Sequence, residues 1–443
     1  MLKILNLFCI QKFTQTSYKP IRSMSTTAQP DLKKPKYDGR TKKRKWEERR
    51  SDKGVGLYPE KKACEEPFVR VKRRKYAILL GYSGVDYYGM QRNPSTKTIE
   101  EDLFKALLKA DLITQEAYEQ IQVIQFQRAA RTDKGVSAAR QVVSIKLPEE
   151  VDISKANELL PEVIRIFGIK RVTKGFNSKS QCDGRTYTYM LPTVAFAKSD
   201  SKETQETFRL SDTVFNEINE LLTHFKGTKN FHNFTCKKNA NDPSAKRYIV
   251  SFECEPPVIR KGVEFVVLKV KGQSFMLHQI RKMVGITLAV IKGYISMDMF
   301  NKAWTQDKLN IPRAPGLGLV LEKVHYDRYN FRYGKDGIHE TLEWTEVDEE
   351  VNAFKEKYIY PTIIDSEVNE KIMLGWLENR LSTHNFEALE GDTQDSDNEH
   401  SSDEEDKDDN CETDVKTNDV ETTNKVDLVE SNVAKYDESN VKP

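Results

Sequence analysis

One short loop of this sequence gathers cations around a single carboxylate, and it is the segment with the clearest capacity for chemistry. The loop reads Arg131-Thr132-Asp133-Lys134-Gly135 and lies between two strand-like segments. Arg131, Lys134 or a distant arginine would stabilise the ionised form of Asp133 through charge attraction. An ionised carboxylate can act as a nucleophile or a base, and Gly135 permits a backbone conformation or a close substrate approach that a side chain would forbid. Taken alone, the same run is also typical of an ordinary surface turn.

The segments around this loop predict a mixed α/β unit that would hold it in place. Alternating apolar residues indicate a strand over about residues 75–82. Thr98 and Glu101 form a capping box at the start of a helix with apolar residues at helical spacing. Two more strands are predicted on either side of the loop, over residues 121–128 and around residues 143–147.

A second α/β unit follows the first. Residues 212–225 place apolar side chains on one stripe of a helix. Strands are predicted near residues 248–253 and 263–270, and residues 277–290 have the pattern of a further amphipathic helix. We expect the two similar halves to share one sheet and to leave a cleft between them.

The composition indicates a globular protein without a membrane partner. Its 443 residues are 38% hydrophobic, which is enough for a buried core and for two or three domains. No stretch approaches the roughly 18 uncharged apolar residues that a membrane-spanning helix needs. The six cysteines lie far apart and form no CxxC pair, so we expect a reduced intracellular compartment and no structural metal.

The net charge of +2 hides a strong segregation of charge along the chain. Residues 390–443 contain nineteen Asp or Glu and five Lys, a net charge of −14, so the remainder carries +16. A basic body suits a polyanionic partner such as a nucleic acid, although lysine-rich surfaces also serve solubility.

The two ends of the chain differ in composition from its middle. Residues 1–30 are basic, rich in Ser and Thr and without acids, as in a mitochondrial transit segment, and Met24 offers a second start. Residues 31–71 form a basic arm whose Lys and Arg run resembles a nuclear-import signal or an RNA-binding arm. Residues 389–443 form an acidic tail that we expect to be disordered. The two N-terminal segments predict placement in both nucleus and mitochondrion.

Five collinear segments resemble one enzyme family. The run Arg131 to Ala138 resembles the catalytic motif of the TruA family of tRNA pseudouridine synthases, and the similarity covers roughly residues 72–388. The other segments, in family order, are Tyr82-Ser83-Gly84 through Tyr88-Gly89-Met90-Gln91 with Thr98 to Glu101, Arg185-Thr186-Tyr187-Thr188-Tyr189, Gly272 to Arg281, and Ala314 to Leu319. Gly175 to Lys179, Gly227 to Phe234 and Tyr358 to Thr362 are similar to the eukaryotic branch called pseudouridine synthase 1.

The resemblance implies the fold. We expect the α/β (α+β) pseudouridine synthase fold over residues 72–388, with a central, mainly antiparallel sheet built from two related halves, about 72–190 and 191–388. Helices should flank the sheet, and a basic RNA-binding cleft should lie between the halves. Members of the eukaryotic branch are expected to be monomers, whereas bacterial relatives dimerise.

The resemblance also implies roles for individual residues. Asp133 would be the catalytic residue, with Arg281 paired to it and Arg131 in support. Tyr187 would stack on the target base. The predicted uracil-pocket residues are Leu317 and Leu319, and the cations expected to hold RNA phosphates are Arg92, Arg128, Arg131 and Lys134.

The implied activity is the isomerisation of uridine to pseudouridine in tRNA, near the anticodon stem, with mRNA and snRNA as further candidate substrates. The reaction breaks the bond between sugar and base, rotates the base and rejoins it through carbon, so it requires no cofactor or metal. A tRNA-binding or chaperone protein of the same fold is the alternative. An RNA glycosidase is a third hypothesis, although it would be expected to use two carboxylates where this loop offers one. The modified uridines, and whether Asp133 attacks the sugar or removes a proton, stay open.

The same residues also have structural interpretations. Tyr187 and Tyr189 lie two apart on a strand, so one of them could belong to the core. Arg281 on an amphipathic helix would ordinarily be a solvated or surface-paired charge. His232 and His278 suggest a general base, but the family motifs give neither that role, and we expect substrate contact or structure instead.

Overall fold

The computed structural model describes residues 72–387, except for residues 200, 202 and 237. This part contains the predicted catalytic domain, 72–388, except for those three residues and residue 388. The transit-like segment with Met24, the basic arm at 31–71 and the acidic tail at 389–443 lie outside the described residues, so what we expect of them stays a prediction.

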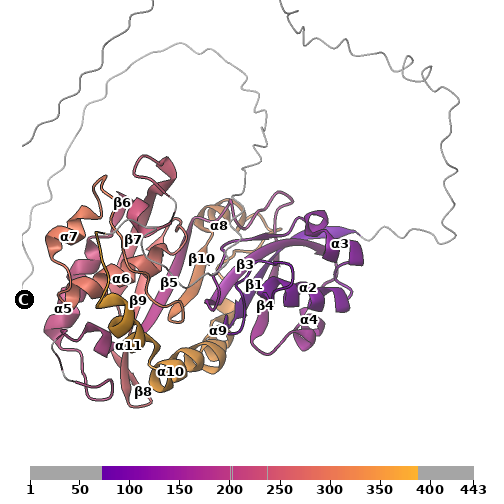
Figure 1. Ribbon diagram of the computed structural model, residues 1–443. Helices are drawn as coiled ribbons and strands as arrows, with labels where there is room; N and C mark the ends of the chain where they lie inside the picture. Colours follow the sequence, from indigo (N-terminus) through magenta and orange to yellow (C-terminus); the bar gives the residue numbers. More distant parts are fainter. Residues whose placement is uncertain (1–71, 200, 202, 237, 388–443) are drawn as a thin grey trace, which may run out of the picture. The chain divides into compact units, whose positions relative to one another are not determined.

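One sheet of ten strands forms the framework of the described part (Figure 1). The strands are β1 (Arg73–Tyr82), β2 (Gln127–Arg128), β3 (Ser137–Pro148), β4 (Ile164–Arg171), β5 (Gly184–Pro192), β6 (Gly227–Asn230), β7 (Lys246–Cys254), β8 (Val258–Arg260), β9 (Val263–Gly272) and β10 (Leu319–His325). They lie in the order β4-β1-β3-β10-β5-β9-β7-β6, with β2 beside β3 and β8 beside β9. β10 and β3 are parallel, and the other pairs are antiparallel. The predicted division at residue 190 falls inside β5.

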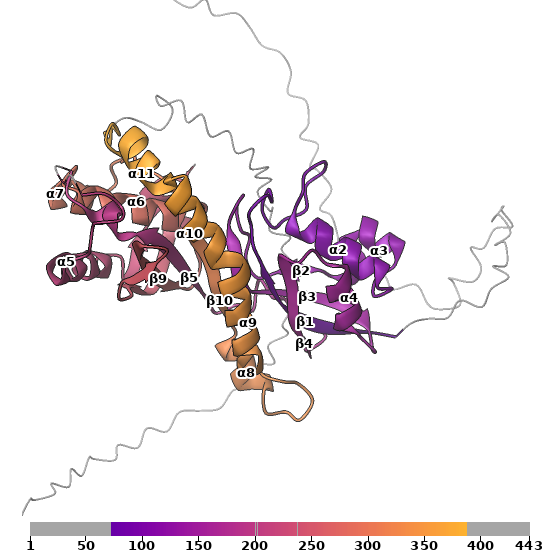
Figure 2. The same cartoon turned by 90° about the horizontal axis from the view of Figure 1, so that it is seen from below.

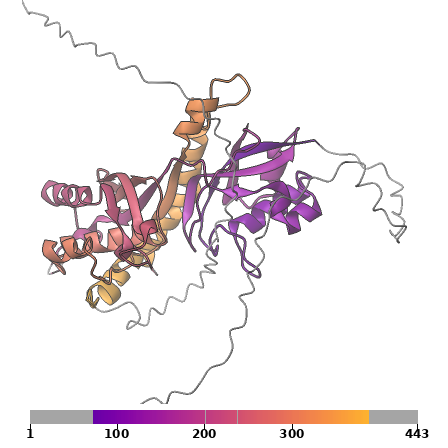
Figure 3. The same cartoon turned by 90° about the horizontal axis from the view of Figure 1, so that it is seen from above.

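Helices flank this sheet. They are α2 (Ile99–Lys109), α3 (Gln115–Glu119), α4 (Ile153–Leu159), α5 (Asp212–Thr223), α6 (Gln279–Ile291), α7 (Met297–Lys302), α8 (Asp327–Tyr333), α9 (Asp348–Phe354), α10 (Tyr360–Asn369) and α11 (Ile372–Trp376), with π-helical turns at Lys355–Ile359 and Leu377–Leu381. α2 to α4 lie with β4, β1 and β3, whereas α5 to α7 lie with β9, β7 and β6 (Figures 1 and 3). The predicted fold class, a mixed α/β domain with a mainly antiparallel sheet and flanking helices, is confirmed.

A long helical segment crosses the middle of the sheet. Figure 2 shows α9 and α10 end to end, joined by the first π-helical turn. They pack against β3 and β5, and an ion-pair cluster adds β10: Arg140 and Lys355 both bind the Glu322 carboxylate, at 3.2 and 2.7 Å. Among the described residues, none of the helices combines the length and apolar character required to span a bilayer.

The predicted apolar stripe of residues 212–225 holds α5 on the sheet. Ile218 and Leu222 are fully buried. Phe225, just beyond the helix, packs against Phe252 of β7 with ring centroids 5.6 Å apart. The stripe therefore does what its helical spacing predicts, because its side chains point to one face and that face is covered.

Only one of the two hydrogen bonds of the predicted capping box is present at the start of α2. The Thr98 side chain accepts a hydrogen bond from the Glu101 amide at 3.3 Å. The Glu101 carboxylate does not accept a hydrogen bond from the Thr98 amide. It accepts one from the Tyr118 hydroxyl at 2.6 Å and pairs with Arg92. The second half of the box is replaced by contacts that tie α3 to α2.

The strand predicted over residues 121–128 is mostly wrong. Only β2, at its end, pairs with β3, and Ile121–Ile124 forms a 3-10 turn. Gln125 then has a left-handed backbone with φ of 49°, which cannot continue a strand. Phe126 is buried and meets Phe104 of α2 edge-on at 4.8 Å. The apolar pattern therefore reflects burial beneath a helix and not strand pairing.

The register of the central strands brings distant motifs together. β10 lies between β3 and β5, where Val320 pairs with Ser137 on one side and with Thr188 on the other. Asp133 precedes Ser137 by four residues, and Tyr187 precedes Thr188 by one. The loop that contains Asp133 therefore enters the sheet close to the strand that carries Tyr187.

Gly285 allows α6 to approach the segment before β10. An added Cβ at this position would lie 2.1 Å from the Pro312 carbonyl oxygen. We predict that Gly285→Ala lowers the free energy of unfolding by about 1–3 kcal/mol through overpacking, even though alanine favours a helix by about 1 kcal/mol. Gly375→Ala in α11 is the matched control, since nothing lies within 4 Å of its added Cβ.

Urea denaturation of the two variants measures the difference. The Gly375→Ala protein should be neutral or slightly more stable than the wild type. Equal stability of the two variants would contradict the close approach of α6 to Pro312.

Candidate active site

The loop that contains Asp133 turns sharply between β2 and β3. Gly135 has a left-handed backbone with φ of 75°, and its amide donates to the Tyr87 carbonyl at 3.2 Å. The Val136 amide donates to the carbonyl of Asp133 at 3.1 Å. The turn thereby fixes the backbone at Asp133, whose side chain is 27% exposed and stays accessible to a substrate.

The loop after β1 supports the loop with Asp133. The Met90 amide donates to the Thr132 carbonyl at 3.1 Å, and the hydroxyls of Tyr82 and Thr132 are 2.8 Å apart. Gly89 has a φ of 91°, and a Cβ there would lie 2.7 Å from the Thr132 carbonyl oxygen. Only glycine combines this conformation with this approach. Two of the five collinear segments are thus packed against one another.

Three side chains from the later part of the chain act on the Asp133 carboxylate. His278 Nδ1 lies 3.3 Å from Asp133 Oδ2. Burial by itself would raise the pKa of Asp133, but contact with His278 and the charges of Arg281 and Arg313 outweigh it, so the pKa lies below its ordinary value. The carboxylate is therefore ionised at neutral pH. Of the cations that the sequence offered for this role, the distant arginines Arg281 and Arg313 lower the pKa of Asp133, in addition to His278.

Arg281 is fixed near the start of α6 and is 6% exposed. Its Nε donates to the Ala314 carbonyl at 2.7 Å, and the Ala314 amide donates to the Arg281 carbonyl at 3.2 Å. A Cβ at Gly316 would lie 3.5 Å from the guanidinium carbon. The segment at 314–319 therefore wraps around Arg281, which joins two more of the five segments.

Tyr187 is a neighbour of this carboxylate. The residue is 7% exposed, and Phe275 packs edge-on against its ring with centroids 5.3 Å apart. Burial raises the pKa of Tyr187 to about 12; the charge of Arg185 opposes this rise, and the negative charge of Asp133 adds to it. The phenol is therefore neutral at physiological pH, and the charge of Asp133 contributes to its raised pKa.

The other residues predicted for the base pocket differ in burial. Tyr189 is 1% exposed and donates to the Pro315 carbonyl at 2.6 Å, so it is the core tyrosine of the pair. Leu319 is opposite Tyr189 in the β5–β10 ladder and is also buried. Leu317 keeps part of its surface exposed, which a residue needs in order to contact a base.

Two of the cations predicted to hold RNA phosphates have acidic partners within the protein. Arg128 pairs with Glu100, whose side chain is fully buried. Arg92 pairs with Glu101 and lies 4.3 Å from the centre of the Tyr118 ring. Arg128 thereby fixes the end of β2 to α2, and Arg92 fixes the segment after β1 to α2 and α3.

The other two predicted cations, Arg131 and Lys134, are exposed. Lys134 Nζ lies 4.7 Å from the Tyr88 ring centroid. Burial raises the pKa of Glu100, and the charges of Arg128 and Arg131 oppose that rise. Arg131 is therefore exposed on the loop, and its charge also favours the ionised form of buried Glu100.

His278 and Arg313 extend the site beyond the residues predicted for it. Arg313 Nη1 lies 2.9 Å from His278 Nε2. From the sequence, His278 was expected to contact the substrate or to have a structural role, and Arg313 was not predicted. The position of His278, three residues before Arg281 in the same segment, was the available signal. His232 is buried elsewhere, with Nε2 3.4 Å from the Asp307 carbonyl oxygen, and has a structural role.

The thiols and potential metal ligands offer no competing site in the part that the structure describes. Cys182, Cys236 and Cys254 have free thiols. Burial raises the pKa of Cys254 to about 12, which makes it a poor nucleophile. Within residues 72–387, apart from the three undescribed positions, no group of three His, Cys, Asp or Glu side chains is arranged to hold a metal ion.

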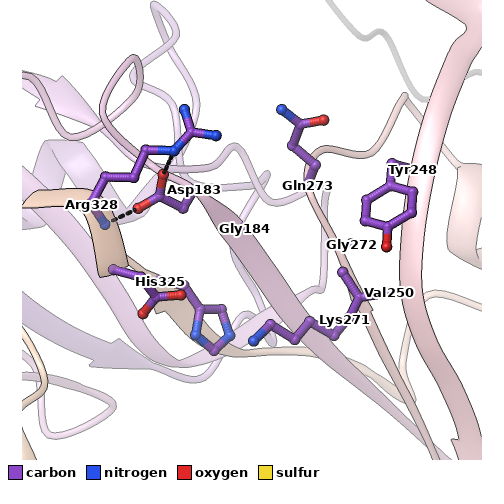
Figure 4. A pocket seen from close by; sticks show the side chains of 10 residues that line it. Asp183, Gly184, Tyr248, Val250, Lys271, Gly272, Gln273, His325 and Arg328 are labelled. Carbon is purple, nitrogen blue, oxygen red and sulfur yellow. Dashed lines mark hydrogen bonds and ion pairs between the residues drawn. The ribbon is translucent and has the colours of Figure 1, made fainter. Parts of the chain in front are cut away.

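A hollow of about 260 Å³ opens at the start of β5 (Figure 4). Lys271 and His325 line it on the side of Thr186, whose hydroxyl is 2.8 Å from His325 Nε2. Successive side chains of a strand point to opposite faces, so Tyr187 points away from this hollow. The hollow is separate from the Asp133 carboxylate.

Comparison with known proteins agrees with this geometry. A family model described as tRNA pseudouridine synthase matches residues 221–327. The chain is 53% identical to Pseudouridylate synthase 1 homolog of Mus musculus over 326 residues, which are 73% of this chain and 77% of that protein. It is 53% identical to the Homo sapiens protein of the same name, over 70% of this chain and 74% of that one. It is 32% identical to tRNA pseudouridine synthase 1 of Candida albicans, over 69% of this chain and 66% of that one. Identity of this degree over most of the chain means that it belongs to the tRNA pseudouridine synthase family.

Proposed function

We propose that this protein converts uridine to pseudouridine in tRNA and that Asp133 is its catalytic residue. The family and the names of the relatives support the isomerase activity and the tRNA substrate. The assignment of Asp133 is carried by one observation: its carboxylate is accessible yet held in the charged form by His278, Arg281 and Arg313.

The chemistry requires such an anion. The bond from the sugar to a ring nitrogen breaks, and the same sugar carbon bonds to a ring carbon. The ring carbon loses a proton and the ring nitrogen gains one, so the composition of the RNA does not change and no oxidant or reductant takes part. An ionised carboxylate can assist this sequence by attack on the sugar or by removal of a proton.

The surroundings of Asp133 suit a uridine that has left its stack. A base inside a helix has to be extruded before its sugar bond can react. Tyr187 offers an aromatic ring beside Asp133, and Leu317 and Leu319 would close the base pocket from β10 and the turn before it. Exposed Lys134 and Arg131 would bind phosphates, with Arg128 orienting the loop as well, so RNA affinity should fall with rising salt.

We predict that Asp133→Asn abolishes pseudouridine formation and leaves tRNA binding intact, because the amide keeps the shape of the side chain but not its charge. The single-turnover rate should fall below about one thousandth of the wild-type rate. Asp152→Asn is the control, since Asp152 caps α4 through the Ser154 amide and asparagine caps a helix equally well.

The products of this experiment separate the competing functions. A glycosidase would release free uracil, and a tRNA-binding protein would leave the uridine unchanged in the wild type as well. Pseudouridine formed at the normal rate by the Asp133→Asn protein would overturn the assignment.

We also propose that the substrates include mRNA and snRNA and that the protein acts as a monomer. The similarity to the eukaryotic pseudouridine synthase 1 branch supports both statements. Pseudouridine mapping of cellular RNA with and without the protein tests the first, and it should lose sites in all three RNA classes. Sedimentation of the protein with and without tRNA tests the second, and a dimer in either state would contradict it.

We further propose that the protein acts in both nucleus and mitochondrion. The transit-like composition of residues 1–30 and the basic run at residues 42–50 support this. A C-terminally tagged product that starts at Met1 should enter mitochondria, and one that starts at Met24 should enter the nucleus. Both products in one compartment would count against the proposal.

A further inference from the structure

The His278 ring lies between an aspartate and an arginine. Its side chain is 7% exposed, and Nδ1 lies 3.3 Å from Asp133 Oδ2. Nε2 lies 2.9 Å from Arg313 Nη1. Arg281, one turn further along α6, adds a second guanidinium charge on the same carboxylate. In the described part of the chain, these charged groups face the ring and its aspartate from the loop that contains Asp133, from α6 and from the segment before β10.

The contact with Arg313 decides which ring nitrogen carries the proton. A guanidinium group has only donors, so Nε2 of His278 has to accept and cannot be protonated. The proton of the neutral ring is then on Nδ1, which faces Asp133. Nδ1 is buried and has no hydrogen-bond partner in the described part of the chain, because its 3.3 Å contact with Asp133 Oδ2 falls outside hydrogen-bond geometry. Such contacts shorten when a substrate completes the site.

The backbone of His278 supports the same interpretation. His278 occupies the N-cap position of α6 with φ of 59° and ψ of 2°, and its side chain makes no capping hydrogen bond. A left-handed conformation is uncommon for a residue with a side chain, and strain of this kind clusters at functional sites. In this conformation the ring lies beside Asp133, with Nδ1 3.3 Å from Oδ2.

We propose that His278 is a positioning residue: it donates its Nδ1 proton to Asp133 and fixes the orientation of the carboxylate, and Arg313 selects the ring tautomer that can do so. This inference rests on the proposed function of Asp133. It adds a role for a histidine that neither attacks the substrate nor exchanges a proton with it.

Two amide substitutions at His278 separate its two contacts. The amide nitrogen of asparagine occupies nearly the place of Nδ1, whereas the amide of glutamine reaches the place of Nε2. His278→Asn therefore keeps a donor for Asp133, and asparagine tolerates the left-handed backbone. His278→Gln keeps a partner for Arg313 and loses the donor.

We predict that His278→Gln lowers the single-turnover rate by about tenfold to hundredfold, as expected for a misplaced reacting group. His278→Asn should stay within about threefold of the wild type. The tRNA dissociation constant should be the same for all three proteins. A merely structural histidine would give equal losses in both variants, in proportion to their melting temperatures.

The pH profile provides a second readout. Loss of a donor to the carboxylate raises the pKa of Asp133, and the rate falls below that pKa because the ionised form is required. The acid limb of the rate profile should therefore move upward by roughly one pH unit in His278→Gln and stay in place in His278→Asn. Arg281 and Arg313 remain, so the shift is partial.

A second His–Asp contact serves as the control. His339 Nδ1 lies 2.5 Å from Asp336 Oδ2 outside the site, and His339→Gln should change neither rate nor pH profile. A glutamine variant at position 278 that is as fast as the asparagine variant, or faster, overturns the proposal. If Asp133→Asn stays active, the proposed function fails; if it is inactive while the two His278 variants match, this inference alone fails.

Discussion

The negative charge on Asp133 is the feature on which the rest of the site depends. Burial of part of the carboxyl group works against ionisation, and His278, Arg281 and Arg313 reverse that effect. These residues follow Asp133 by 145 to 180 positions in the chain. The charged state of Asp133 at neutral pH is therefore a product of tertiary structure. It requires α6 and the segment before β10 to be packed beside a loop that belongs to the first part of the domain.

The central strands provide that packing. β10 comes late in the chain, yet it lies between β3 and β5 and runs parallel to β3. Because β10 lies between β3 and β5, the loop that contains Asp133 lies close to the strand that carries Tyr187. The segment at 314–319, which contacts Arg281, leads directly into β10. Close approaches at Gly89 and Gly285 complete the arrangement, because a Cβ at either position would collide with a carbonyl oxygen. Small residues at these points thus control where the charged side chains lie.

The sequence predicted the fold where the signal is local and failed where it is not. The stripe at residues 212–225 has helical spacing, which depends on neighbours in the chain alone. The segment at 121–128 is apolar but not extended, because Gln125 turns left-handed and the side chains pack under α2. At the site, the motif around Asp133 could be recognised from residue types. The contact between His278 and Arg313 joins two segments that no periodicity connects, so the sequence could not indicate it.

The same electrostatics favour an isomerase over a hydrolase of the sugar–base bond. Guanidinium groups do not lose their protons near neutral pH, so the charge of Asp133 is constant across the physiological range. A glycosidase also needs a carboxylic acid that stays protonated and reaches the leaving base. Among the described residues, the acidic side chains with raised pKa values are Glu100 and Glu367, and burial is the main cause in both. They are 0% and 2% exposed, so neither can touch RNA. The site therefore has one anion and, among the described residues, no accessible carboxylic acid of this kind. A detached base would not be protonated by a second carboxyl group. This favours rejoining the base to the sugar over its release.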